Sequence, residues 1–205
     1  IDYKVKYLLK ELKEDKNFHI LKIKGGEKIK SINNYSKLIS KLLKLKINRS
    51  SHIISIGGGT VGDLTGFIAS TILRGVKFTL VPTTLLSQVD SSIGGKNGIN
   101  SIYGKNLIGT FLQPDKVIID ISTLNSLTKR EIRSGYAEIL KHAIIKDLKF
   151  YKWLDYNYER VINLESKFIT KAIIQSIKIK TFFIQKDEKE NLINNYSRAM
   201  LNFGH

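Results

Sequence analysis

The sequence lacks cysteine, is poor in acidic residues and has no long apolar run. The absence of cysteine from its 205 residues excludes disulfide frameworks, thiolate metal sites and cysteine nucleophiles. No apolar run approaches the length needed to cross a bilayer, and the N-terminal residues do not form the apolar core of a signal peptide. Hydrophobic residues make up 42% and charged residues 25%, which is a globular composition. We therefore expect a soluble, cytoplasmic protein without a membrane partner.

The shortage of acidic residues gives the chain a strong positive charge. Thirty-four Lys and Arg against 18 Asp and Glu leave a net charge of +16. Such an excess can indicate nucleic acid, an anionic membrane surface or acidic small molecules as partners. The longest basic stretch, 37–49, alternates Leu and Ile with Lys at helical spacing, which is typical of the solvated face of a packed helix. No aromatic residue is interleaved with it for base stacking, so we favour a compositional bias and expect no nucleic-acid partner.

Hydrophobic periodicity predicts an α/β unit followed by a helical one. The expected strands cover 18–25, 52–59, 76–82 and 116–122, and the expected helices cover 4–13, 31–46 and 62–73. Alternating strands and helices imply a parallel sheet covered on both faces. From residue 129 to 185 only helical periodicity is found, and the polar run at 186–197 predicts a loop or a frayed helix end. We predict an α/β fold: a Rossmann-like nucleotide-binding domain over 1–128, then the beginning of an all-α metal- and substrate-binding domain over 129–205.

A glycine-rich loop lies between the second predicted strand and the helix that follows it. Residues 57–63, GGGTVGD, fit the G-x-G-x-x-G pattern, in which glycines let the backbone approach a pyrophosphate and helix amides face its charge. The loop departs from the pattern by its third glycine and by Asp63, whose charge opposes a phosphate. No acidic residue ends the next strand to hold a ribose. Alone, the motif supports nucleotide binding and a purely structural glycine turn about equally.

The region 82–106 is rich in glycine, lysine and small polar residues. Thr83 and Thr84 follow a predicted strand, at the edge of the sheet where ligands bind in open α/β folds. Lys96 and Lys105 each follow a glycine, and we expect them in short polar loops where an ammonium can meet a phosphate or carboxylate. A surface lysine in so basic a chain usually has no such role, but two lysines in Gly-Lys-Asn contexts beside the glycine-rich loop favour one.

One predicted helix carries an acidic residue among apolar neighbours. Glu138, Lys141 and His142 lie at i, i+3 and i+4 and therefore share a face. The carboxylate either pairs with the lysine, which the local sequence favours, or binds a metal. His205 offers an imidazole elsewhere in the chain, and Glu and His ligands suit zinc.

Taken together, several segments resemble the 3-dehydroquinate synthase family. They occur in the family's order between Gly26 and His205, and their joint pattern is far more specific than any single motif. The segments are GGGTVGDLTGFIAS at 57–70, RGVKFTLVPTTLLSQVDSSIGGKNGIN at 74–100, YGKNLIGTFLQPDKVIID at 103–120, Thr123-Leu124, RSGYAEILKHAIIKD at 133–147 and RAMLNFGH at 198–205.

The resemblance implies an enzyme of the shikimate pathway that binds NAD and a divalent metal, zinc or sometimes cobalt. Its substrate is the anionic sugar phosphate 3-deoxy-D-arabino-heptulosonate 7-phosphate, and its products are 3-dehydroquinate and phosphate. The family reaction proceeds by transient oxidation, β-elimination of phosphate, re-reduction and intramolecular aldol closure. The resemblance also implies a homodimer.

The resemblance assigns roles by motif position. The NAD-binding positions are Glu27, Lys30, Gly59, Thr60, Val61, Gly62, Asp63, Thr83, Thr84, Asp90, Lys96, Lys105, Thr123, Leu124, Asn125 and Ser126. The catalytic and substrate-binding positions are Lys96, Lys105, Asn106, Lys141, Lys180, Arg198, Asn202 and Arg74, the last of which reaches the site of the other subunit. The metal-binding positions are Glu138 and His205. His142 falls where family members vary and is not assigned as a ligand.

Some family features fall outside this sequence. The family has a further strand before the position of Ile1 and a third metal ligand after the position of His205. We therefore expect an internal fragment of such an enzyme that is inactive alone, because catalytic zinc normally has three protein ligands. The alternatives are a sister sugar phosphate cyclase with the same cofactors and a basic, non-catalytic remnant.

Overall fold

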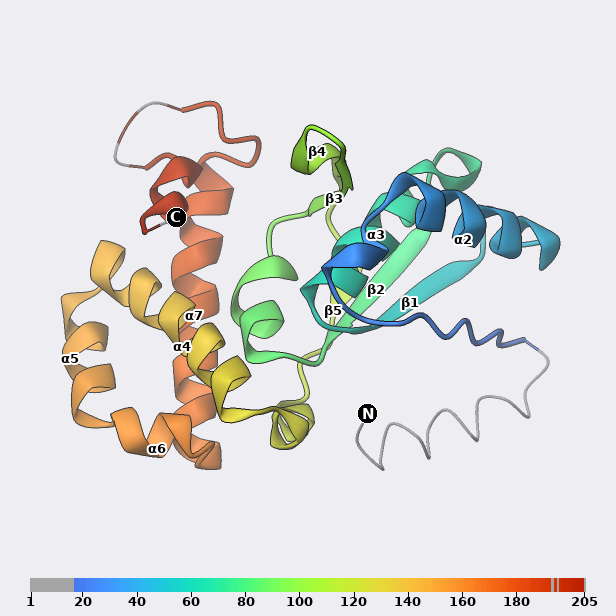
Figure 1. Cartoon of the computed structure of the whole chain (residues 1–205). Helices are drawn as coiled ribbons and strands as arrows, with labels where there is room; N and C mark the ends of the chain where they lie inside the picture. The colour runs from blue at the N-terminus through green and yellow to red at the C-terminus, as the bar shows by residue number, and fades with distance from the viewer. Residues whose placement is uncertain (1–16, 193, 195, 205) are drawn as a thin grey trace.

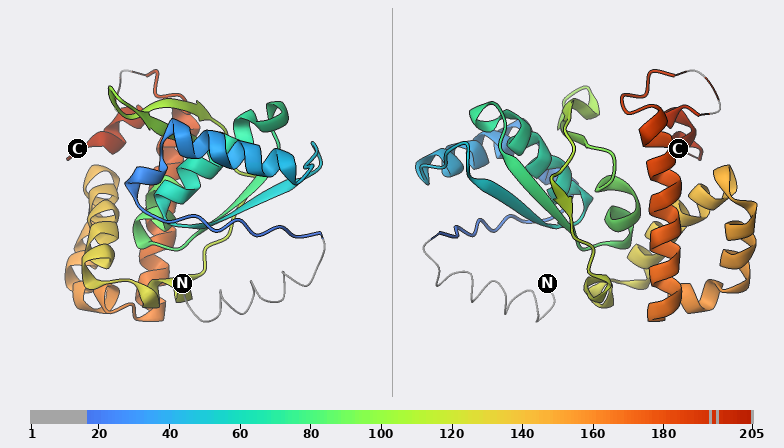
Figure 2. Two further views of the ribbon diagram at one scale, coloured as in Figure 1. Left: turned by 45° about the vertical axis from the view of Figure 1, so that its right-hand side comes forward. Right: turned by 180° about the vertical axis from the view of Figure 1, so that it is seen from behind.

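The computed structural model describes residues 17–192, 194 and 196–204, which form two units lying side by side (Figure 1). One unit combines a parallel sheet with helices, and the other is built from helices, of which the longest, α7 (Ser166–Lys186), runs along its length (Figure 2). The predicted fold class is confirmed. The helix expected over 4–13 lies outside the described residues. Among the described helices, none is long and apolar enough to cross a membrane.

The parallel sheet has the strand order β1-β2-β5. Strand β1 (His52–Gly57) pairs with β2 (Lys77–Pro82), and β2 pairs with the short β5 (Lys116–Val117). Helix α3 (Gly59–Thr71) makes the crossover between the first two strands, as a parallel pair requires. All three strands therefore end at one edge of the sheet, next to the glycine-rich loop.

Helices cover the two faces of this sheet unequally. Phe78 and Leu80 on one face are buried in a core that they share with side chains of α3. Ile54 and Ile56 on the opposite face are 51% and 40% exposed, so the expected cover on both faces is wrong for the part of the chain that the structure describes. The difference arises because β-branched strand residues predict burial without specifying which element supplies it.

Three predicted elements differ in extent from the observed ones. The alternating segment 18–25 forms no strand, because within the described residues it pairs with no other strand. The strand expected over 116–122 is limited to β5, since the chain turns at Asp120, whose carboxylate accepts the Ser122 N–H (2.8 Å) and begins the short helix η4 (Ile121–Ser126). The helix expected from residue 62 begins earlier, at Gly59. Helix α2 (Ile32–Lys44) confirms the helix expected over 31–46.

An antiparallel hairpin packs against α3 and was not expected from the sequence. Strands β3 (Lys96–Ser101) and β4 (Gly104–Phe111) place Gly98 opposite Gly109. A Cβ on Gly98 would lie 2.8 Å from the Ile108 carbonyl oxygen, so the strands approach more closely than a side chain permits. Lys96 and Lys105 lie in these strands, and their placement in loops was therefore wrong.

The first long helix after the sheet, α4 (Lys129–Lys146), begins at Lys129, the residue from which the sequence shows only helical periodicity. The helical unit also contains α5 (Leu148–Tyr156) and α6 (Tyr158–Ile162). The Thr128 hydroxyl accepts the Glu131 N–H (3.3 Å) and the Glu131 carboxylate accepts the Thr128 N–H (2.8 Å), which fixes the start of α4 with a capping box.

The turn after β2 belongs to both units. It contains the π-helical segment η3 (Ser87–Ser91), and Leu85 and Val89 are fully buried in the core of the helical unit. The boundary between domains at residue 128 stays a prediction. Because η3 is packed from both sides, Asp90 within it is held between the glycine-rich loop and the helices.

Candidate active site

The glycine-rich loop is tightly packed against neighbouring side chains at the carboxyl edge of the sheet. A Cβ on Gly57 would lie 2.8 Å from Cβ of Val61, which leaves no room for a side chain, and one on Gly59 would lie 2.6 Å from the Ser91 hydroxyl oxygen, which would have to rotate away. Gly59 and Thr60 begin α3, whereas the N–H groups of Val61 and Gly62 already donate to the Gly58 carbonyl oxygen (3.0 and 3.1 Å), so the amides left for a ligand are those at the very start of the helix. This cradle of glycines at a helix start fits a phosphate group of a nucleotide.

The charge of Asp63, which the motif left unexplained, is balanced within the structure. Lys30 is only 3% exposed, and its ammonium donates to Asp63 Oδ2 (2.7 Å) and to the Asn106 side-chain oxygen. Burial raises the pKa of the Asp63 carboxyl, although Lys30 opposes this rise. The sequence separation of the three residues gives no signal of this contact, so the sequence analysis missed it.

A buried ion pair joins the two units at Asp90. The Lys180 ammonium of α7 donates to Asp90 Oδ1 (2.6 Å) and to the Asp90 carbonyl oxygen. Burial favours the neutral acid, but the Lys180 ammonium outweighs it and holds the pKa of Asp90 below its usual value. Burial also lowers the pKa of Lys180. The ion pair fixes the orientation of both side chains. Asp90 is a predicted cofactor-binding residue and Lys180 a predicted substrate-binding residue.

A second ion pair lies on α4. Glu138 and Lys141 form the i, i+3 contact that the local sequence favours, and their side chains are 15% and 8% exposed. Glu138, Lys141 and Lys180 thus bring two positive and one negative charge to the region of Asp90.

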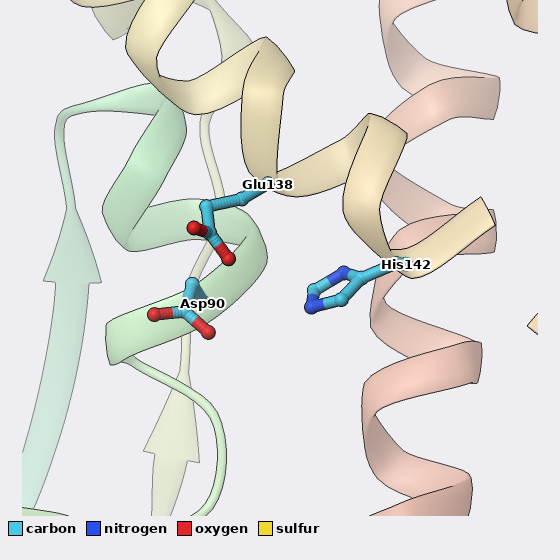
Figure 3. A group of neighbouring side chains, drawn as sticks. All are labelled: Asp90, Glu138 and His142. Carbon is cyan, nitrogen blue, oxygen red and sulfur yellow. The ribbon is translucent and has the colours of Figure 1, made fainter. Parts of the chain in front are cut away.

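His142 faces the same region, as Figure 3 shows with Asp90 and Glu138. One potential ligand atom from each of these three residues lies within 4.8 Å of the others. His142 is fully buried, and its Nδ1 lies 2.6 Å from the Ser176 hydroxyl oxygen, whereas its Nε2 has no hydrogen-bond partner among the described residues. Burial lowers the pKa of His142 to about 4, which leaves a neutral imidazole at pH 7.

These donors fit a divalent metal of the zinc type. Two carboxylates and one neutral imidazole are ligands that zinc and cobalt accept, and the buried Nε2 atom of His142 is unpaired. A bound cation would replace the charge that Lys141 and Lys180 now bring to the two carboxylates. His205, the second predicted ligand, lies outside the described residues. The geometry adds His142 and Asp90 to the candidates, although the sequence analysis left His142 unassigned and gave Asp90 to the cofactor.

The C-terminal segment adds a third group of predicted residues. In η5 (Arg198–Asn202), the Arg198 guanidinium is buried and donates to the Gly94 carbonyl oxygen (2.9 Å) beside η3. Asn202 Nδ2 donates to Glu190 Oε1 (2.7 Å), and Lys96 forms an ion pair with the same carboxylate. Glu190 therefore holds two predicted substrate residues, and nothing in its polar sequence context indicated this.

Other predicted residues differ in how available their side chains are. The Thr83 N–H donates to the Gly57 carbonyl oxygen (2.9 Å), and the Thr84 hydroxyl pairs with that of Ser87 (2.8 Å), so both threonines lie beside the glycine-rich loop. Thr123 and Leu124 are buried, which leaves the exposed Asn125 and Ser126 accessible in η4. Their role toward a cofactor stays a prediction.

Two predicted residues lie apart from this arrangement. Arg74 is exposed in the turn before β2, at the opposite edge of the sheet from the glycine-rich loop, and its φ of 68° is left-handed. Lys105 is exposed on β4. A single chain therefore does not bring Arg74 to the candidate site.

Asp187 holds the turn that leads to Arg198. Its carboxylate accepts the N–H groups of Asn191 (2.7 Å), Leu192 (3.2 Å) and Arg198 (3.0 Å). Burial would raise the pKa of Asp187, but these main-chain hydrogen bonds hold it below the usual value.

We expect Asp187→Asn to loosen this turn. The side-chain nitrogen of asparagine only donates hydrogen bonds, so the amide cannot accept all three N–H groups. The measurement is the rate of chymotrypsin cleavage after Tyr196, which should increase severalfold, with Glu188→Gln as the control that removes a neighbouring charge. Because the folded pKa is depressed, the stabilisation by Asp187 is present above about pH 4 and is lost as the pH falls through the folded pKa. Equal cleavage of both variants and the unmodified chain would contradict this role.

The fold and the site define an α/β unit with a glycine-rich loop at a helix start, joined to a helical unit that carries acidic and basic site residues. Models of the 3-dehydroquinate synthase N-terminal and C-terminal regions match residues 20–134 and 135–205. The chain belongs to the 3-dehydroquinate synthase family.

Curated relatives agree with this membership. The chain is 54% identical over 181 residues to a 3-dehydroquinate synthase of Pelagibacter ubique, and the matched region covers 88% of the chain and 48% of that relative. It is 47% identical over 187 residues to the one of Dictyoglomus turgidum, covering 91% of the chain and 52% of the relative. The chain thus spans about half the length of the curated relatives it matches.

Solved structures of sugar phosphate cyclases share the fold. A 2-epi-5-epi-valiolone synthase of Streptomyces hygroscopicus with NAD+ and Zn2+ bound matches with a TM-score of 0.83 at 26% identity, over 89% of this chain and 51% of that one. A 2-deoxy-scyllo-inosose synthase complexed with carbaglucose-6-phosphate, NAD+ and Co2+ matches with a TM-score of 0.64 at 26% identity, over 91% and 50% of the two chains.

Proposed function

We propose that the protein containing this chain converts 3-deoxy-D-arabino-heptulosonate 7-phosphate to 3-dehydroquinate and phosphate, in the shikimate pathway. The observation that carries the proposal is the meeting of Asp90 and Glu138 with Lys141 and Lys180, next to the glycine-rich loop. The higher identity to 3-dehydroquinate synthases than to the other cyclases supports this substrate over a sister heptulose phosphate.

The residues of the site have distinct roles in this proposal. The glycine-rich loop with Lys30 and Asp63 binds the cofactor, and Glu138 holds the metal together with His205, with Asp90 and His142 within reach. When bound, NAD supplies reversible hydride transfer and zinc or cobalt polarises the reacting hydroxyl group.

The basic residues of the site hold an anionic substrate. Lys141, Lys180 and Arg198 are buried, and ammonium and guanidinium groups bind phosphate and carboxylate. Desolvation strengthens these contacts, and the fixed positions of the side chains orient the substrate for intramolecular closure. A homodimer in which Arg74 serves the other subunit, and a cytoplasmic location, are parts of the proposal that rest on the family resemblance.

The test is phosphate release from the heptulosonate phosphate with NAD and zinc, measured for the 205-residue chain and for the product of its complete reading frame. We expect activity in the complete product and a loss of more than about 100-fold in Glu138→Gln, since even residues that support a metal ligand contribute 10- to 100-fold. Zinc content of the purified variant is the second readout and should fall with the activity. Release from a different heptulose phosphate alone would favour a sister cyclase, and no release from either would contradict the proposal.

A further inference from the structure

Asn100 connects segments that carry predicted ligand-binding residues: it lies on β3 and contacts Glu27 and Lys30 on one side and Asn106 on the other. Its side-chain Nδ2 donates to Glu27 Oε1 (2.8 Å), and its Oδ1 accepts the N–H of Asn106 (3.0 Å). Its own N–H donates to the Lys30 carbonyl oxygen (2.8 Å). The residue lies where the β3–β4 register shifts between Ile99 and Ser101, an irregularity of the kind that redirects a side chain out of a regular ladder.

The contacts of Asn100 are part of a longer polar network. Asn106 has a left-handed φ of 58°, which asparagine tolerates better than most residues but which still needs support. Its side-chain oxygen accepts from the Lys30 ammonium, which also donates to Asp63 Oδ2 (2.7 Å). Glu27, Asn100, Asn106, Lys30 and Asp63 are therefore linked continuously, from the short helix η1 (Glu27–Ile29) through the hairpin to α3.

The hairpin needs such an anchor. Ile102 and Tyr103 at its tip are 91% and 86% exposed, and most of β4 is exposed as well. At its base, Asn97 Nδ2 donates to the carbonyl oxygens of Gly95 and Leu112 (2.9 Å each). Asn100 holds the outer half, where buried apolar contacts that would restrict local opening are few.

We propose that Asn100 is a positioning residue that couples the cofactor-binding segment to the substrate-binding part of the hairpin. The inference rests on the proposed function and on the roles that the family resemblance assigns, in which Glu27, Lys30 and Asp63 bind NAD while Lys105 and Asn106 bind the substrate. Asn100 touches no reacting group in this arrangement. It acts by holding Glu27 in place and by keeping Asn106 in the conformation that presents its neighbour Lys105.

The variants separate the two halves of the amide. Asn100→Ala removes both the donor and the acceptor. Asn100→Asp keeps the acceptor for Asn106 but sets a carboxylate against Glu27, and adding Glu27→Gln to it reverses the hydrogen bond, because the glutamine can donate to the aspartate. Asn33→Ala, an exposed asparagine in α2, is the matched control.

The measurements are NAD affinity, steady-state kinetics and hydrogen exchange on the product of the complete reading frame. In Asn100→Ala we expect NAD affinity and the substrate KM each to worsen about tenfold, because a lost hydrogen bond of ordinary strength corresponds to about that factor. We expect kcat to stay within about threefold and amide exchange at 103–108 to accelerate, which a general loss of stability does not produce selectively. The Asn100→Asp/Glu27→Gln pair should bind NAD more tightly than the product of the two single effects predicts.

The outcomes distinguish this inference from the proposed function. If the unmodified protein binds NAD and releases phosphate while Asn100→Ala matches it in affinity, KM and exchange, the positioning role is wrong and the function stands. If the unmodified protein binds no NAD, the proposed function is wrong and the coupling falls with it. Strictly multiplicative effects in the double variant would overturn the link to Glu27.

Discussion

Replacing Lys180 with methionine is expected to destabilise the chain by about 2–3 kcal/mol. Methionine keeps most of the apolar packing on α7 but leaves the Asp90 carboxylate without the ammonium that donates to it from 2.6 Å. Removing one partner of a fully buried pair costs about 3–5 kcal/mol. The cost here is smaller because the Asp90 side chain keeps 29% of its exposure, so water replaces part of the lost interaction.

Urea unfolding of Lys180→Met, Asp90→Asn and the double variant measures this effect. The double variant should lose at least about 1 kcal/mol less than the sum of the single losses, since it no longer contains an unpaired buried charge. Phosphate release by the product of the complete reading frame should be reduced at least about 100-fold in all three variants. The double variant regains stability, but it still lacks both charged side chains of the site. Additive losses of stability would show that the two side chains do not support each other.

Gly66→Ala is expected to destabilise the chain by about 2 kcal/mol and to displace the hairpin. An added Cβ would overlap Asn97 Oδ1 and would lie 2.5 Å from its Cγ. Asn97 cannot swing away without losing its hydrogen bonds to Gly95 and Leu112, and such overpacking costs about 1–3 kcal/mol or more. The gain of about 1 kcal/mol from alanine in a helix offsets only part of that cost.

The same helix offers a matched control for this prediction. A Cβ on Gly62 would lie 3.6 Å from Leu80 Cδ2, an ordinary contact, so Gly62→Ala should stabilise the fold by up to about 1 kcal/mol. Urea unfolding of both variants should thus give shifts of opposite sign. A Gly66→Ala/Asn97→Ala variant should be no less stable than Asn97→Ala, because the overlap is gone. A Gly66→Ala variant as stable as the unmodified chain would contradict the close packing of α3 on β3.

Local patterns in the sequence predicted the elements whose own residues have a strong hydrophobic periodicity. The strand β1 was predicted from its β-branched run and the glycines after it, and the helix α2 and the start of α4 were predicted from helical periodicity. The hairpin escaped notice because β3 contains glycine and asparagine, which are uncommon in strands, and its stability comes from packing on α3. The segment 18–25 shows the reverse case, since its alternation suits a strand that in the described structure has no partner.

The candidate site divides in the same way. The glycine-rich loop and the pair Glu138–Lys141 are local in sequence and were predictable as features. The ion pairs Lys30–Asp63 and Asp90–Lys180 depend on the meeting of distant elements, so no spacing rule contains them. The family resemblance named these residues as ligands but did not indicate that they hold one another in place. The roles themselves stay predictions.

The segment η3 has a mechanical consequence. Its residue Val89 and the preceding Leu85 are fully buried among the helices, while Ser91 lies against Gly59 of the opposite unit. A bending motion centred on the connection near residue 128 would separate these side chains from their core, so the packing of η3 opposes a simple hinge at that connection.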